Sequence, residues 1–135
     1  MAKIAWSEDL SVGIGKFDNE HKKLVELLNK LNEAMSQGQG QKILSGILSE
    51  LSTYTKTHFK HEEEAMEMYK YPGITEQKAQ HTEFVAKLQE MQAQYNAGTL
   101  SLSISVFNFL VSWVQNHIKR EDKKYSDFFI KNGLV

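Results

Sequence analysis

Several histidines and one glutamate occupy positions at which an apolar residue would continue the buried stripe of a helix. His58 lies seven residues after Leu51, and Glu62 follows four residues later on the same helical face. Because burial of a lone carboxylate costs on the order of several kcal/mol, inward imidazoles and carboxylates are normally paired or bound to a metal. The side chains with this placement are His21, His58, Glu62, Gln77, His81 and His117.

The chemistry open to these side chains is metal binding through nitrogen and oxygen. The chain has no cysteine, which excludes zinc thiolate sites, iron–sulfur clusters and thiol nucleophiles. Nitrogen and carboxylate donors suit iron, manganese, zinc or copper. One inward histidine is usually a hydrogen-bonded core residue, but four together with a glutamate favour a metal site. They exceed what one tetrahedral zinc needs, so we expect two metals bridged by Glu62 and Asp122.

Asp122 is out of phase with the other candidate ligands. It follows His117 by five residues, which places it about 140° away on an ideal helix. Its convergence on the site therefore predicts a local wide turn or a break, such as the bulges often found at functional sites. The fifth histidine, His61, has charged neighbours that include Glu63 and Glu64, and we expect these three side chains at the surface or rim.

Four segments with helical periodicity must position these side chains. Breaks at residues 38–40, 72–73 and 96–99 separate them, and Asp18 is placed to cap the first. Four amphipathic helices with short connections predict an all-α fold, an up-down-up-down antiparallel four-helix bundle. In that topology the starts of helices one and three meet the ends of helices two and four, which would collect the candidate ligands in one layer. The predicted helices span Glu20 to Met35, Lys42 to Tyr69, Thr75 to Tyr95 and the segment from Ser101 onwards.

Length and composition favour a single domain over residues 1–135, with no nucleic-acid or membrane partner. Residues 1–17 carry enough apolar side chains to form an ordered N-terminal arm packed on the bundle. Sixteen basic residues against seventeen acidic ones argue against a dominant phosphate-binding surface. No segment approaches the roughly 20 apolar residues needed to cross a bilayer. The first residues lack the apolar centre of a signal peptide, so a cytoplasmic protein is the default expectation.

The motifs resemble those of the hemerythrin family, specifically its single-domain bacterial members, the bacteriohemerythrins. The similarity begins with W-x-x-x-L-S-V-G-I-x-x-F-D at residues 6–18 and E-H-K-x-L at residues 20–24. These motifs, taken in order, cover almost the whole chain. They continue with H-F-x-x-E-E at 58–63, Y-P-G at 71–73, H-x-x-F at 81–84 and W-x-x-x-H-I-x-x-x-D-x-x-Y at 113–125.

This resemblance implies a non-haem di-iron protein that binds dioxygen reversibly, for carriage, storage or sensing. It also implies that two iron ions share an oxo or hydroxo bridge, and that the protein is a binder rather than an enzyme. The ligands implied are His21 and His58 on the iron with an open position, His81 and His117 on the other iron, and Glu62 and Asp122 as bridges.

One position departs from the family pattern, in which the third helix carries H-x-x-x-H. The first of these two positions is Gln77 here, while the second is His81. A glutamine carbonyl is a weaker neutral donor for iron than an imidazole. We therefore expect the di-iron site to assemble with an altered or extra open position on the iron held by His81 and His117.

The resemblance also implies which residues surround the ligand-binding position and leaves other functions open. The alternatives are peroxidase-like or oxidase-like activity at the altered site, and binding of nitric oxide or of a stored metal. The expected assembly is a monomer or a small homo-oligomer. The implied pocket residues are Leu24, Phe59, Trp113 and Val114, with Tyr125 near the site.

Overall fold

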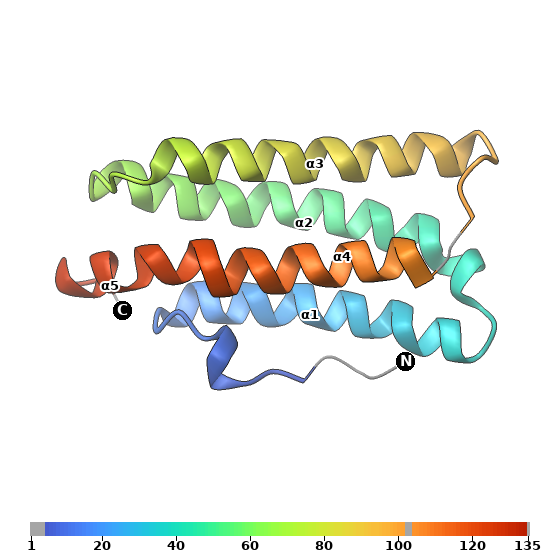
Figure 1. Cartoon of the computed structure of the whole chain (residues 1–135), viewed down its shortest axis with the longest axis horizontal. Coiled ribbons are helices and arrows are strands. Elements are labelled where there is room, and N and C mark those ends of the chain that lie inside the picture. Colours follow the sequence, from blue (N-terminus) through green and yellow to red (C-terminus); the bar gives the residue numbers. More distant parts are fainter. Residues whose placement is uncertain (1–4, 102–103, 135) are drawn as a thin grey trace.

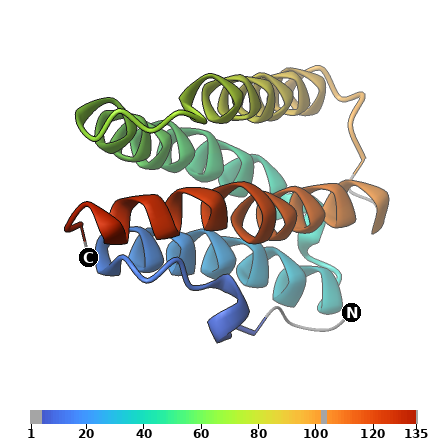
Figure 2. The same ribbon diagram turned by 60° about the vertical axis from the view of Figure 1, so that its left-hand side comes forward.

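The fold is a bundle of four long helices in antiparallel order, seen from two directions in Figures 1 and 2. The computed structural model describes residues 5–101 and 104–134, and all regular structure within these residues is helical. In Figure 1, α4, the π-helix η2 and α5 follow one another as the fourth rod of the bundle. The predicted all-α, up-down-up-down bundle is therefore confirmed. The elements are η1 (Glu8–Leu10), α1 (Gly15–Ser36), α2 (Gly40–Met68), α3 (Ile74–Asn96), α4 (Ile104–Asn116), η2 (His117–Asp122) and α5 (Lys123–Lys131).

The start of α1 differs from the prediction. Because α1 begins at Gly15, Asp18 lies within its first turn, and the capping role predicted for Asp18 is wrong. The Asp18 carboxylate instead accepts hydrogen bonds from the Val12 backbone N–H at 2.7 Å and from the Ser11 hydroxyl at 2.6 Å. Phe17, which the sequence assigns to the arm, also belongs to the helix. These hydrogen bonds tie the N-terminal segment to the beginning of α1.

The described part of the N-terminal arm is ordered against the bundle, as predicted. Leu10, Val12 and Ile14 are buried, and the Ser126 hydroxyl on α5 donates a hydrogen bond to the Val12 carbonyl. Gly13 has φ +70°, and a Cβ there would lie 3.0 Å from an Ile130 side-chain carbon. A side chain at this position would therefore meet both backbone strain and crowding. Residues 1–4 lie outside the described residues.

The fourth helix of the sequence prediction corresponds to three consecutive elements. The sequence places its start at Ser101, whereas α4 begins at Ile104, and residues 102 and 103 lie outside the described part of the chain. In the described residues, no helix is long and apolar enough to cross a membrane.

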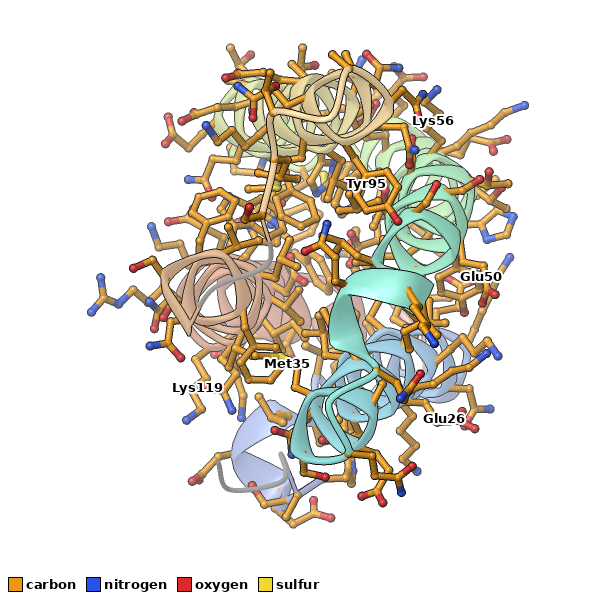
Figure 3. The ribbon with its side chains drawn as sticks, turned by 90° about the vertical axis from the view of Figure 1, so that its right-hand side faces the viewer. Glu26, Met35, Glu50, Lys56, Tyr95 and Lys119 are labelled. Carbon is orange, nitrogen blue, oxygen red and sulfur yellow. The ribbon has the colours of Figure 1, made fainter. Side chains whose placement is uncertain are left out.

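Most of the buried side chains in the described residues are apolar, and most of the buried polar ones gather in one layer. Figure 3 looks along the bundle: the labelled charged side chains of Glu50 and Lys119 point outward, whereas Tyr95 lies toward the interior. The Tyr95 hydroxyl donates a hydrogen bond of 2.9 Å to the Gln41 carbonyl and so joins α3 to α2. The fully enclosed apolar side chains lock the helices in register. They include Leu28, Leu31, Leu44, Leu48, Leu51, Leu88 and Leu110.

Candidate metal centre

The polar layer depends on a change of helix type within the fourth rod. Residues His117–Asp122 form a π-helix, which confirms the predicted wide turn. Each turn of a π-helix holds more residues than an α-turn, so a side chain five positions later returns to the same face. Asp122 therefore lies beside His117, with Oδ1 at 3.1 Å from the His117 Nε2.

The structure brings all the sequence-predicted ligand positions into one buried layer. We call this set the inner layer. Its donor atoms form two overlapping groups, each containing two histidines and the same two carboxylates, with one atom per residue within 4.8 Å of the others. Every member is at most 5% exposed. The inner layer consists of His21, His58, Glu62, Gln77, His81, His117 and Asp122.

The four imidazoles of the inner layer direct Nε2 toward its carboxylates. The His21 Nε2 lies 3.3 Å from Glu62 Oε2 and 3.1 Å from Asp122 Oδ2. The Nε2 atoms of His58 and His81 lie 3.3 and 3.5 Å from Glu62 Oε1. Four nitrogens and two carboxylates thus surround a common space, the donor arrangement that nitrogen and oxygen metal sites require.

The outward nitrogens of three imidazoles are held by a second set of residues. The His58 Nδ1 donates to Glu20 at 2.7 Å, and the His81 Nδ1 donates to Glu63 at 2.8 Å. The His117 Nδ1 donates to Oε1 of Gln80 at 2.8 Å. Such partners fix the orientation of a metal-binding imidazole and raise its basicity. We call Glu20, Glu63 and Gln80 the outer acceptors.

Sequence reasoning missed the outer acceptors. Glu63 was expected at the surface, yet its carboxylate holds His81. The sequence does contain a signal: each outer acceptor is adjacent to an inner-layer residue, and each contacts a histidine on the next of the four rods of the bundle. Glu20 precedes His21, Glu63 follows Glu62, and Gln80 precedes His81.

Several buried polar atoms of the inner layer have no hydrogen-bond partner among the described residues. They include Glu62 Oε1, Asp122 Oδ2 and Gln77 Oε1. The Asp122 Oδ2 is within ion-pair distance of His21 but lacks hydrogen-bond geometry. Unsatisfied buried oxygens are costly, and a bound cation would satisfy them. The residues present therefore fit a pair of metal ions.

Burial and charge oppose each other in the inner layer. Burial alone raises the pKa of Glu62, but the charge of His58 and a hydrogen bond from His21 hold it well below its usual value. Burial alone lowers the pKa of His58, but the charge of Glu62 and the hydrogen bond to Glu20 raise it to about 10. The pKa of His81 is lowered by burial, and the charge of His117 adds to that lowering. A metal must therefore displace protons, chiefly from the His58 side.

Gln77 lies inside the inner layer, one turn before His81 on α3. Its side chain is buried, and its Nε2 donates a hydrogen bond of 3.1 Å to Asp122 Oδ1. Its Oε1 is among the partnerless oxygens. The amide thus orients Asp122 with one end and offers a neutral oxygen with the other.

The sequence-predicted pocket residues differ in how closely they contact the inner layer. The Phe59 ring stacks on His81 at 3.8 Å between centroids, and the Trp113 ring stacks on His117 at 4.5 Å. The Tyr125 hydroxyl donates a hydrogen bond to Glu62 Oε2. The other two, Leu24 and Val114, are buried core residues. Two aromatic rings and the Tyr125 hydroxyl therefore contact the layer directly.

Comparison with known proteins assigns the family. Residues 12–129 match the hemerythrin HHE cation binding domain. Among curated relatives, the bacteriohemerythrin of Stenotrophomonas maltophilia (strain R551-3) is 33% identical over 127 residues, covering 94% of this chain and 82% of that protein. Myohemerythrin-1 of Phascolopsis gouldii is 32% identical over 120 residues, covering 89% of each. A crystal structure of wild-type hemerythrin superposes with a TM-score of 0.85 at 28% identity, covering 93% of this chain and 97% of that one. The chain therefore belongs to the hemerythrin family.

Proposed function

We propose that this protein is a non-haem di-iron protein that binds dioxygen reversibly, for carriage, storage or sensing. In this proposal residues 1–135 act as one domain, and Gln77 alters one iron site. One observation carries it: two groups of donor atoms, each with two histidines, share Glu62 and Asp122 and are buried inside the bundle. Family membership and the names of the relatives support the same function.

The two donor groups define which residues would hold each iron. His21 and His58 would hold the first iron, and His81 and His117 would hold the second, with Gln77 as a weak neutral donor. Glu62 and Asp122 would serve both irons. A bound iron pair would supply the reversible binding of dioxygen. The lower ligand strength of an amide oxygen weakens the second position relative to the first.

The surrounding residues orient the ligands and keep water out. Tyr125 holds Glu62 through its hydroxyl, and the stacked rings of Phe59 and Trp113 fix the planes of two histidines. Leu24 and Val114 complete the apolar wall. A dry apolar wall slows the loss of a bound ligand and controls the reactivity of a metal site.

A second candidate function is favoured by Gln77. Its amide N–H donates to Asp122, and its carbonyl oxygen, the only donor that an amide offers a metal, is neutral. A second iron with fewer strong protein ligands is open to small molecules, which favours peroxidase-like or oxidase-like chemistry. Nitric oxide is an alternative diatomic ligand for the same position.

Iron loading without air, followed by optical spectroscopy as oxygen is admitted and removed, tests the proposal. Two irons per chain and a visible band that appears and disappears with oxygen are the expected results. Fewer than two irons per chain would contradict the di-iron assignment. A band that forms once and decays to a ferric product would contradict reversible binding and favour the second function.

A further inference from the structure

His61 is the one histidine outside the inner layer, and it is not an isolated surface residue. Its side chain is 31% exposed, which agrees with the predicted rim position. Its Nδ1 donates to Glu20 Oε2 at 2.6 Å, while Oε1 of the same carboxylate accepts from the His58 Nδ1 at 2.7 Å. Glu20 on α1 is therefore held between two imidazoles that lie about one turn apart on α2.

This arrangement distinguishes Glu20 from the other outer acceptors. Glu63, which is 27% exposed, binds His81 and has no second imidazole donor among the described residues. Gln80 offers a single amide oxygen to His117. Glu20 is also the more enclosed of the two carboxylates, with a side chain 15% exposed.

Physical chemistry explains why a second donor matters. A glutamate side chain has several rotatable bonds, so a single hydrogen bond leaves it free to turn toward water. A second charge-assisted hydrogen bond at the opposite oxygen fixes the carboxylate plane. A fixed plane holds the His58 Nδ1–H outward and keeps the His58 Nε2 facing Glu62.

We infer that His61 is a positioning residue of the metal centre, acting through Glu20 to hold His58 in its binding orientation. Its functional meaning rests on the proposed metal site, whereas the positioning itself is a property of the metal-free protein. His61 does not touch the inner carboxylates in this arrangement. His61, Glu20 and His58 form a chain of hydrogen bonds that runs from the rim of the bundle to the inner layer.

Nuclear magnetic resonance of the metal-free protein tests the positioning directly. Exchange of the His58 Nδ1 proton with water is slow in the parent protein and at least about tenfold faster in His61→Ala. His61→Asn keeps an N–H donor near the position of Nδ1 and restores slow exchange. The His81 Nδ1 proton, held by Glu63, stays unchanged in every variant. Equal exchange at His58 in the parent and in His61→Ala would overturn the inference.

Anaerobic titration with Co²⁺, followed by calorimetry and visible absorption, tests the consequence for the metal. His61→Ala binds the first ion about tenfold more weakly than the parent, the lower end of the range for outer partners of a metal ligand. His61→Asn recovers most of this loss, and Lys60→Ala, at the exposed neighbouring position, changes nothing. Unchanged Co²⁺ affinity in a folded His61→Ala would contradict the inference. A parent protein that binds no Co²⁺ would instead contradict the proposed metal site, while the exchange measurement would still decide the positioning role.

Discussion

The two halves of the inner layer are built from similar ligands but are supported differently. The His58 side rests on a carboxylate held by two imidazoles, and the pKa of His58 rises to about 10. The other side rests on a more exposed carboxylate and an amide, and the pKa of His81 falls. Residues outside the ligand set therefore support the two sides differently, whereas the pKa of His58 is raised chiefly by the charge of Glu62 within the layer.

The amide of Gln77 adds a further difference on the second side. Its N–H donates a hydrogen bond to Asp122, a carboxylate that both donor groups share. A change on one side can therefore reach the other through Asp122, because neighbours in one hydrogen-bond network do not act additively.

The largest effect is expected from removing a carboxylate that both halves of the inner layer share. Glu62→Ala removes one shared bridge, and we expect the metal content to fall from two ions to less than one per chain. Loss of the partner of buried His58 also lowers the free energy of unfolding of the metal-free protein by about 3 kcal/mol. Elemental analysis and urea denaturation measure the two effects. Glu64→Ala, at an exposed position on the same helix, is the matched control.

Replacing the Gln77 amide by an imidazole tests how far this residue weakens the second metal position. Gln77→His adds a stronger donor one turn before His81, and we expect the second metal ion to bind at least about tenfold more tightly. Stepwise calorimetric titration with Co²⁺ measures the two affinities separately. An unchanged second affinity would mean that position 77 contributes nothing to metal binding.

Neutralising the two outer carboxylates one at a time compares the two supports. Glu20→Gln weakens the first binding step and Glu63→Gln the second, each by about tenfold or more. We expect the larger loss for Glu20→Gln, because its carboxylate holds two imidazoles rather than one. The same titration measures both. Equal weakening of both steps by each variant would show that the halves are not independently supported.

The most gradual effect is the pH dependence of the metal-free protein. The pKa of His58 is raised from 6.5 to about 10, so its stabilising contribution is complete below about pH 6.5 and is lost as the pH rises toward 10. Glu62 has a lowered pKa, so its contribution is complete above about pH 4.5 and is lost as the pH falls below that value. The pKa shift of His81 is opposite in direction to that of His58. Because the His81 pKa is lowered, its protonation below pH 6.5 destabilises the folded protein.

Urea denaturation across this pH range, with a chelator present, measures the balance. We expect the free energy of unfolding to be greatest near pH 6.5. It falls toward pH 10 as His58 loses its proton, and it falls below pH 6.5 as protonation first disfavours His81 and then neutralises Glu62. Stability that keeps rising from pH 6.5 to 10 would contradict the role given to His58.

Much of the fold could be predicted because helical periodicity is a local property. The spacing of Leu51, His58 and Glu62 places them on one face whatever the rest of the chain does. The same geometry, applied to the five-residue separation of His117 and Asp122, predicts a wide turn or a break if Asp122 joins the site, and the structure has a π-helix there. The antiparallel topology, which brings the starts of two helices beside the ends of the other two, was enough to predict that these side chains lie in one layer.

The outer acceptors could not be predicted because they depend on how neighbouring helices are rotated against each other. Whether Glu63 meets water or His81 is decided by the packing of α2 against α3, and Asp18 meets the arm only because the arm folds back on α1. Periodicity within one helix does not contain that information.

The sequence alone determined the four helices, the inward histidines and Glu62, and the need for a wide turn or a break before Asp122, since each is a matter of residue type and spacing along one element. Only the tertiary structure decided which residue binds the outer nitrogen of each histidine, and that Gln77 donates to Asp122. The physical reason is that a hydrogen bond across helices depends on distances of a few tenths of an ångström. Packing of the whole bundle sets those distances.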